Sequence, residues 1–426
     1  MERPRFSFGA SLLGVTVERL PHERRLSHLG LPSEIDLLSR LVEINSDSTL
    51  KTGYVECANL IKREAEATGL KTEVYDSAEL AADRKPRPNV VARLDVDAEE
   101  TVILVTHYDI VPAGPGWRYQ PFKLTIEGDK AFGRGAADDK GAIVSVISAL
   151  RELKKTKPGA NVVFLASPDE EVGGELGLGY LVNHVKISGD AGIVIDASPS
   201  AVSIGASGLL WGKLTVKGKQ GHAAYPYLSE NAIEKAIPFL EDISRYAKIR
   251  ERIRSKIRSP PGSPHKQIWG RFSLTMLNAG TKENIIPGEC EARFDLRVCP
   301  DENYETAKKN FTKYFEKVRS ACKVDATLEY TRQDPSNYFT DPKHPLVRQF
   351  SRAAKDAFGQ EIPVAGELGG NDGRYLARVG IPVVCFGPIR DDCRFHGVDE
   401  FVHLRDIELV SRTLVNLIRD WDTKKQ

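Results

Sequence analysis

The stretch GRGAADDKGAIVSVISALREL, residues 133–153, decides the fold class. It opens with a glycine-rich loop, after which Ile143, Val146 and Leu150 recur at the spacing of one helix face. Three apolar, strand-like runs surround this helix: residues 102–105, 161–166 and 192–195. Strand, helix and strand in this order predict an α/β fold with mostly parallel strands. Sheets of this kind bind ligands in the loops that follow the carboxyl ends of their strands.

A different pattern begins near residue 205. We expect strands and helices in the order β-α-β-β-α-β, which describes a ferredoxin-like α+β unit. These elements are predicted at residues 209–216, 231–249, 268–277, 289–298, 305–322 and 326–331. Alternating helical and strand-like patterns, as in the first half of the chain, resume from Pro345. The small unit therefore interrupts the larger one.

The chain has 426 residues, which exceeds the size at which one hydrophobic core usually stops growing. We predict a larger domain of residues 31–204 and 334–426 and an inserted domain of residues 205–333. Residues 1–30 are expected to be a poorly ordered or surface-docked extension.

The composition is that of an ordinary globular protein, with a net charge of +1 and 28% charged residues. This balance predicts no nucleic-acid partner, and the apolar runs are too short to span a membrane. The basic and proline-rich segment 250–264 is interpreted as a solvated helix end and loop. Six scattered cysteines without a C-x-x-C pair are typical of free thiols, so we expect a cytoplasmic protein.

Polar motifs follow the apolar runs. His107 comes directly after the run 102–105, and Asp109 lies two residues further on, where it can fix the imidazole ring. The loop 133–141 places Asp138 at a helix start, which an ordinary acidic first turn would also explain. Its carboxylates would repel a phosphate, so a cation site is the better interpretation.

Further acids end the next two runs. Glu170 and Glu171 belong to three consecutive acids, which are costly unless positive charge lies among them; a solvated turn is the alternative. Asp196 ends the run 192–195, and His396 lies in a late loop. Two histidines and several carboxylates suit Zn²⁺, or Co²⁺ or Mn²⁺ in its place, better than Mg²⁺.

The order of these motifs resembles the M20 metallopeptidase family: H-x-D, G-R-G-x-x-D-x-K-G, D-E-E-x-G-G, a strand-end acid and a late histidine. This family includes acetylornithine deacetylase, succinyl-diaminopimelate desuccinylase, aminoacylase and glutamate carboxypeptidase. The resemblance runs from about Leu37 to the C-terminal helix. It implies a zinc-peptidase-like catalytic domain with a mixed, mostly parallel sheet, an inserted ferredoxin-like domain that serves as lid or dimerisation unit, and two divalent metal ions.

Carried over residue by residue, the resemblance implies five metal ligands: His107 and Asp196 for one ion, Glu171 and His396 for the other, and Asp138 as the bridge. Asp109 would orient His107, and Glu170 would act as the general base. In the inserted domain, His222 would stabilise the oxyanion, often across a homodimer interface. Four further residues are expected to contact the substrate: Asn284, Arg297, Asp372 and Gly387. For Arg297, a structural ion pair with Asp295 is an equally good interpretation.

The implied reaction is hydrolysis of an amide bond in an N-acyl amino acid or a short peptide. The segment 366–374, GELGGNDGR, resembles G-G-T-S-D-G-R of the desuccinylase branch, with Asn in place of the Thr-Ser pair. The pair Asp138-Asp139 is instead similar to the dipeptidase and carboxypeptidase branches. We favour the N-acyl amino acid deacylase and keep the peptidase as the alternative. A non-catalytic binding relative is disfavoured because Glu170, the five ligands and His222 are all present.

Overall fold

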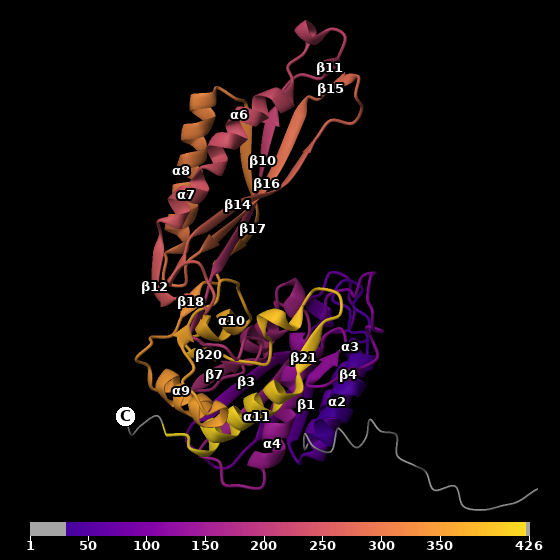
Figure 1. Cartoon of the computed structure of the whole chain (residues 1–426), viewed down its shortest axis with the longest axis vertical. Coiled ribbons are helices and arrows are strands. Elements are labelled where there is room, and N and C mark those ends of the chain that lie inside the picture. The colour runs from indigo at the N-terminus through magenta and orange to yellow at the C-terminus, as the bar shows by residue number, and fades with distance from the viewer. Residues whose placement is uncertain (1–30, 423–426) are drawn as a thin grey trace, which may run out of the picture.

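The computed structural model describes residues 31–422, which form two bodies (Figure 1). The larger body is built on an eight-stranded sheet in the order β1-β2-β6-β3-β7-β20-β8-β19. Its strands are β1 (Lys71–Asp76), β2 (Pro88–Leu94), β3 (Thr101–His107), β6 (Asn161–Ser167), β7 (Ala191–Val194), β8 (Val202–Ser203), β19 (Val364–Ala365) and β20 (Val383–Cys385). Strand β3 is parallel to both β6 and β7, β7 is parallel to β20, and β1 and β2 are antiparallel to their neighbours. The predicted mixed, mostly parallel α/β sheet is confirmed.

The central strands are buried on both faces, which explains why their sequences read as continuous apolar runs. In β3, Val102 and Leu104 pack into the core on one face of the sheet, and Ile103 and Val105 into the core on the other. The first face is covered by α2 (Pro32–Glu43), α3 (Tyr54–Ala67), α4 (Gly141–Leu153), α9 (Pro345–Phe358) and α11 (Leu404–Arg419). The second is covered by α5 (Leu178–Tyr180) and α10 (Gly373–Arg378).

The smaller body is a four-stranded antiparallel sheet with its own core and with helices on one face. Its order is β14-β16-β10-β17, formed by β10 (Gly208–Lys217), β14 (Arg271–Ala279), β16 (Glu289–Val298) and β17 (Ala326–Asp334). The helices are α6 (Ala232–Ser244), α7 (Tyr246–Glu251) and α8 (Tyr304–Cys322). A two-stranded pair, β11 (Gly221–His222) and β15 (Ile285–Ile286), lies at the end of this body that is remote from the larger one (Figure 1).

Short strands complete the described part of the chain: β4 (Thr125–Glu127), β5 (Lys130–Phe132), β9 (Gly205–Ala206), β12 (Arg254–Arg258), β13 (Gln267–Trp269), β18 (Tyr338–Phe339) and β21 (Phe401–His403). The interpretation of residues 250–264 as a solvated helix end and loop is wrong in two respects. Arg250 is buried and forms an ion pair with Glu302, with an Nη1–Oε1 distance of 2.6 Å. Residues 254–258 belong to the β12–β13 hairpin, whose connecting residues 259–266 form the loop.

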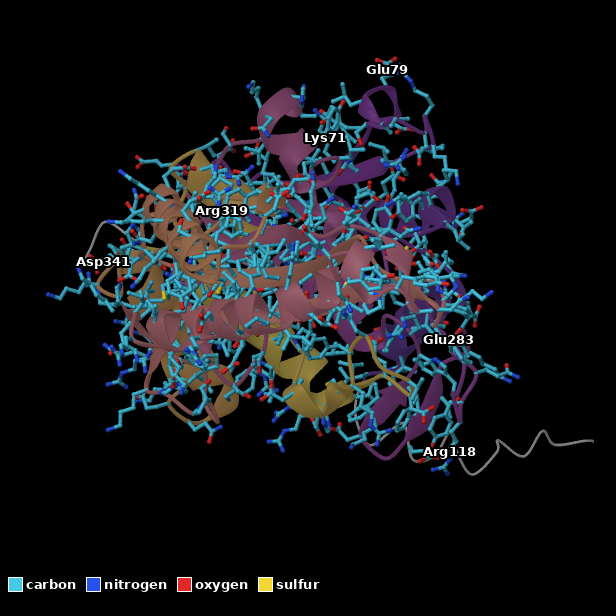
Figure 2. All side chains as sticks on the ribbon, turned by 90° about the horizontal axis from the view of Figure 1, so that it is seen from above. Lys71, Glu79, Arg118, Glu283, Arg319 and Asp341 are labelled. Atoms are coloured by element: carbon cyan, nitrogen blue, oxygen red, sulfur yellow. The ribbon has the colours of Figure 1, made fainter. Side chains whose placement is uncertain are left out.

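The outer surface carries charges of both signs, as Figure 2 shows for Glu79, Arg118 and Asp341 around the margin of the molecule. Within residues 31–422, no helix has the length and apolar character needed to cross a bilayer. The predicted extension, residues 1–30, lies outside the described residues.

Candidate active site

The predicted metal ligands converge at the carboxyl ends of neighbouring strands. His107 is the last residue of β3, Glu171 follows β6 in the next loop, and Asp196 lies just beyond β7. Asp138 comes from the loop before α4, and His396 from the loop before β21. Sheet topology explains the convergence, because β6, β3 and β7 are adjacent and parallel and therefore end at one edge.

Asp138 lies between the two histidines. Its Oδ1 is 3.0 Å from Nε2 of His107, and its Oδ2 is 3.1 Å from Nε2 of His396. The same His396 nitrogen is 3.0 Å from Oε2 of Glu171. Asp138 thus presents one carboxylate oxygen to each side of the centre, which is the arrangement that a bridging ligand requires.

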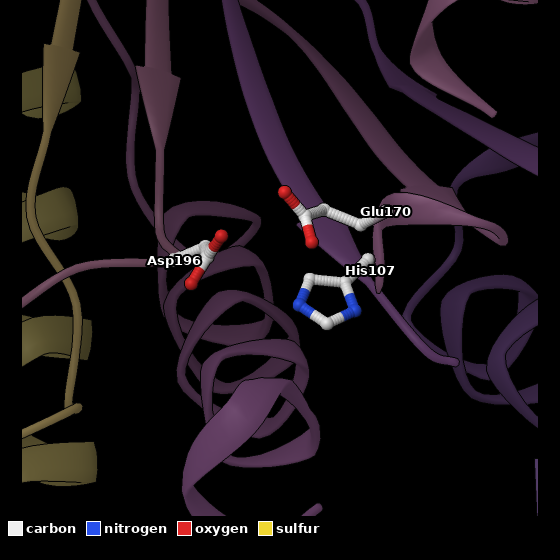
Figure 3. A group of neighbouring side chains, drawn as sticks. All are labelled: His107, Glu170 and Asp196. Atoms are coloured by element: carbon white, nitrogen blue, oxygen red, sulfur yellow. The ribbon is translucent and has the colours of Figure 1, made fainter. Parts of the chain in front are cut away.

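Two groups of potential ligands share this centre. The ligand atoms of Asp138, Glu171 and His396 all lie within 4.8 Å of one another, as do those of His107, Glu170 and Asp196. Figure 3 shows the second group, with the carboxylates of Glu170 and Asp196 facing the His107 ring. Glu170 is thus close enough to act either as a ligand or as a base.

Asp109 contacts both His107 and the loop that carries Glu170 and Glu171. Its carboxylate lies 3.3 Å from Nδ1 of His107, and the two carboxylate oxygens accept hydrogen bonds from the backbone N–H groups of Glu170 and Glu171, each at 3.2 Å. Asp109 is fully buried. One carboxylate therefore orients the His107 ring and the loop that carries Glu170 and Glu171.

The electrostatics of the protein groups are those of a cation site. Burial raises the pKa of Glu170 to about 8, with the charge of Asp372 adding to the effect, and burial likewise raises the pKa of Asp196 well above its usual value. Hydrogen bonds from His107 and His396 outweigh burial at Asp138 and hold its pKa below its usual range. The hydrogen bonds to Asp138 and Glu171 raise the pKa of His396 to about 10. Several buried carboxylates in one place favour positive charge among them.

The donor set fits divalent metal ions. Two imidazoles and three carboxylates supply the mixed nitrogen and oxygen ligation that Zn²⁺, Co²⁺ and Mn²⁺ accept. In addition, Oδ1 of the fully buried Asp139 has no hydrogen-bond partner among the described residues. The peptide bond between Asp138 and Asp139 is cis.

A buried ion pair connects two of the ligand loops. Arg134 in the loop before α4 contacts Oε2 of Glu400, and its Nη2 donates a 2.9 Å hydrogen bond to the carbonyl of Gly397, the neighbour of His396. The other carboxylate oxygen of Glu400 accepts hydrogen bonds from the backbone N–H groups of Ala137 and Asp138, at 3.0 and 3.1 Å. The only indication of this ion pair in the sequence is that Glu400 lies close to His396 along the chain.

A second anchor was missed. Asp169, a non-glycine residue with a φ of 66°, accepts hydrogen bonds from Lys51, Tyr54 and Arg87 at 2.7–2.8 Å. These contacts hold the start of the Glu170–Glu171 turn. The sequence could have indicated it, because Asp169 is the first of three consecutive acids and only Glu170 and Glu171 were assigned a role.

Asp372 joins the centre. Its carboxylate is buried, has no hydrogen-bond partner among the described residues, and lines a small cavity with His107, Glu170 and Asp196. A Cβ atom at Gly174 would lie 2.2 Å from its Oδ1, so the last glycine of the D-E-E-x-G-G motif makes room for this carboxylate. Gly387 is also required for packing, since a Cβ there would lie 1.9 Å from the carbonyl oxygen of Ile195.

The predicted residues of the inserted domain do not join the centre within this chain. His222 on β11 and Asn284 beside β15 are exposed neighbours at the remote end of the smaller body (Figure 1). Arg297 forms an ion pair with Asp295, with an Nε–Oδ1 distance of 2.9 Å. The alternative interpretation of Arg297 as a structural ion-pair partner describes the geometry observed.

Known proteins are similar to this chain in sequence and in fold. The chain is 29% identical over 326 residues to the succinyl-diaminopimelate desuccinylase of Marinobacter nauticus, covering 72% of this chain and 79% of that protein. It superposes on the M20 family metallo-carboxypeptidase of Sulfolobus solfataricus with a TM-score of 0.72 at 20% identity, covering 91% and 98% of the two chains. A Bacillus subtilis protein described as a dinuclear metal binding peptidase from the M20 family gives a TM-score of 0.63 at 16% identity, covering 93% and 98%.

The model of peptidase family M20/M25/M40 matches residues 103–420, a span that contains all the residues of the candidate metal centre. Within this span lie both histidines, the candidate bridge Asp138 and the carboxylates around them. The protein is therefore an enzyme that acts on amide bonds and a member of peptidase family M20/M25/M40.

Proposed function

We propose that the protein is a metal-dependent hydrolase that cleaves the amide bond of an N-acyl amino acid, with Glu170 as the general base. The observation that carries this proposal is the position of Asp138, which offers one oxygen to each of two ligand groups. We assign His107, Asp196 and Asp138 to one divalent ion and Glu171, His396 and Asp138 to the other. Zn²⁺ is the first choice, with Co²⁺ or Mn²⁺ as substitutes.

Two divalent ions held by these residues would supply a water molecule of lowered pKa and a Lewis acid for the scissile carbonyl. Glu170 accepts a proton from the attacking water as the new C–O bond forms. It then delivers this proton to the nitrogen as the C–N bond breaks, leaving a carboxylic acid and an amine. Burial raises the pKa of the Glu170 carboxyl above its usual value, which makes its carboxylate a stronger proton acceptor than an exposed one.

We propose that the enzyme is a homodimer in which His222 of one subunit stabilises the oxyanion in the site of the other. The distance of β11 from the metal centre supports action across a subunit interface (Figure 1). A groove of about 540 Å³ between α6 and the edge strand β14 also supports pairing. It exposes Ile237, Met276 and Leu277, each by more than half. In this arrangement residues 205–333 serve as lid and dimerisation domain.

The substrate contacts are proposals as well. Asp372 lines the same small cavity as Glu170, which supports a contact with the substrate. Asn284 lies next to His222 and would act with it. Arg297 would have to exchange Asp295 for a substrate carboxylate. Gly387 would contribute close backbone approach. The free state of all six cysteines supports a cytoplasmic location.

The second candidate is a dipeptidase or carboxypeptidase of the same family. The pair Asp138-Asp139 favours it, and the likeness to a metallo-carboxypeptidase agrees with it. Both candidates hydrolyse an amide beside a carboxylate, so substrate preference separates them.

A hydrolysis panel tests the proposal. N-acetyl and N-succinyl amino acids are compared with dipeptides, after removal of metal and addition of Zn²⁺, Co²⁺ or Mn²⁺. We expect activity only with added metal and higher kcat/KM on the N-acyl amino acids. Higher kcat/KM on dipeptides would select the second candidate, and metal-independent hydrolysis would overturn both.

A further inference from the structure

The turn that carries Glu170 and Glu171 begins with a residue in the left-handed region of backbone conformation. This residue is Asp169, whose φ of 66° is uncommon for any amino acid other than glycine. Its carbonyl accepts hydrogen bonds from the N–H groups of Val172 at 3.2 Å and Gly174 at 2.7 Å. The conformation of Asp169 therefore closes the turn and sets the direction in which the side chain of Glu170 leaves the backbone. A conformation of this kind persists only where the surrounding structure holds it.

Three side chains hold Asp169 in this conformation. Its Oδ1 accepts hydrogen bonds from Nζ of Lys51 at 2.7 Å and from the hydroxyl of Tyr54 at 2.8 Å, and its Oδ2 accepts one from Nε of Arg87 at 2.7 Å. The side chains of Asp169 and Arg87 are each 5% exposed. Hydrogen bonds between ionised groups are roughly twice as strong as neutral ones, and burial protects them from screening by salt. We refer to Lys51, Tyr54 and Arg87 as the Asp169 clamp.

The charges of the clamp are balanced by the chain itself. Arg87 also donates from Nη1 and Nη2 to the two carboxylate oxygens of Asp83, at 2.8 and 2.9 Å. The cations Lys51 and Arg87 thus face the carboxylates Asp169 and Asp83. Neither of the two ligand groups formed by the described residues includes a member of the clamp. We therefore expect the clamp to hold the turn in the metal-free protein as well.

The loop before α3, which supplies two members of the clamp, also supports Asp109. The hydroxyl of Ser46 donates to the carbonyl of Tyr108 at 2.5 Å, and the N–H of Ser48 donates to the carbonyl of Ile110 at 2.9 Å. Asp109 lies between these two residues, and its carboxylate accepts the N–H groups of the two glutamates in the turn. Both carboxylates that hold the turn are therefore connected to one loop.

We propose that Lys51, Tyr54 and Arg87 are positioning residues for amide hydrolysis, which act through Asp169 to aim the carboxylate of Glu170. The inference rests on the proposed role of Glu170 as the base. A base must lie within hydrogen-bond reach of the proton that it accepts, and a displacement of about 1 Å can cost about 100-fold in rate. Glu171 is also held by His396, with an Oε2–Nε2 distance of 3.0 Å, so a looser clamp should disturb the base more than this ligand.

Arg87→Met tests the role on the metal-loaded full chain, with the amide that the wild type hydrolyses fastest. The change removes one cation from the clamp and keeps an apolar side chain of similar length. We expect kcat to fall about 10- to 100-fold, while KM changes less than about threefold and the metal content stays that of the wild type. An unchanged kcat, or a loss confined to KM, would overturn the role.

Asp83→Asn is the matched control for Arg87→Met. It removes a 41% exposed partner of the same guanidinium on the side away from the turn and leaves the contact between Arg87 and Asp169 in place. It should change kcat by less than about twofold, because partly exposed ion pairs contribute little. A loss as large as that of Arg87→Met would show that the contact with Asp169 is not the cause.

A double-mutant cycle tests whether Arg87 acts through Asp169. Asn tolerates the left-handed region, so Asp169→Asn removes the charge without excluding the conformation. If both residues act through one contact, the double variant should lose no more kcat than the more damaged single variant, within about threefold. Losses that multiply would overturn the inference. If Arg87→Met does not fold, Tyr54→Phe removes one hydroxyl from the clamp and should lower kcat about three- to tenfold, and an unchanged kcat would count against the clamp.

Hydrogen exchange of the metal-free protein separates this inference from the proposed function, because it needs no turnover. The amides of Val172 and Gly174 donate to the carbonyl of Asp169. In Arg87→Met they should exchange at least about threefold faster than in the wild type, while the amides of β6 keep their wild-type rates. If the wild type hydrolyses no amide, the proposed function fails. The hold of the clamp on the turn still stands if these two amides exchange faster, and it falls if their exchange matches the wild type.

Discussion

Replacing Glu400 with Gln should weaken both the fold and the metal centre, although Glu400 touches no proposed ligand side chain. Glu400 and Arg134 are each about 1% exposed in their side chains. One carboxylate oxygen faces the Arg134 guanidinium, and the other faces the N–H groups of Ala137 and Asp138. All the partners are donors. A Gln side chain brings one acceptor and one donor, so in either orientation its NH₂ group faces a donor.

The size of the expected loss in unfolding free energy follows from the burial of this ion pair. Breaking a buried ion pair by removing one partner costs about 3–5 kcal/mol, because the remaining charge is left uncompensated. We expect a loss of this size in the unfolding free energy of the metal-free protein. Disturbance of residues that orient metal ligands typically lowers metal affinity about 10- to 100-fold. The more affected ion should be the one held by Asp138 and His396, because Glu400 and Arg134 join their loops.

The assay is urea unfolding of metal-free protein together with calorimetric metal titration. Both are done at pH 8 or above, because burial raises the pKa of Glu400 to about 7. Glu408→Gln is the matched control, since that carboxylate forms an exposed i,i+4 pair with Arg412. If Glu400→Gln matched the control in both measurements, the reasoning that this ion pair holds the two ligand loops would be refuted.

Three other outcomes are expected. Glu170→Gln should lower kcat about 10²- to 10⁴-fold while both metals stay bound, and loss of a metal would instead mark Glu170 as a ligand. His222→Ala should lose most activity with unchanged metal content, and mixing it with Glu170→Gln should restore turnover if His222 acts across a dimer; no recovery would speak against that arrangement. Chelation should lower the melting temperature, and Zn²⁺ should restore it, because a ligand at 100 times its Kd adds about 2.7 kcal/mol of stability; equal melting curves would contradict a metal-stabilised fold.

Part of the candidate metal centre could be predicted because His107, Glu171 and Asp196 follow the ends of strands. Strands β3, β6 and β7 are buried on both faces, so they are visible as apolar runs, and parallel pairing brings the residues after them to one edge. His107 and Asp196 follow directly from this rule. The strands of the smaller sheet were likewise predicted within a few residues of their observed bounds, for example β16.

Other features depend on contacts between distant segments and leave little trace in the sequence. Strands β8 and β19 have two residues each, too few for a periodic pattern. The pairing of Arg250 with Glu302 joins residues 52 positions apart and turns an apparently solvated helix end into a buried one.

The β12–β13 hairpin is a place where sequence changes can alter the substrate specificity of this enzyme. The carbonyl of Arg258 accepts a hydrogen bond from Gly366 at 2.9 Å, and a Cβ at Gly366 would lie within 3.0 Å of Ile257 and Ile268 side chains, so the hairpin is tightly seated on the larger body. Only its tip, residues 260–264, lines the cavity of about 580 Å³ beside Asp138 and Asp196. Insertions or deletions at this tip can deepen or shorten the cavity without moving any metal ligand. Sequence changes at this tip, natural or engineered, can therefore alter which substrates the cavity admits. The residues of the candidate metal centre stay the same.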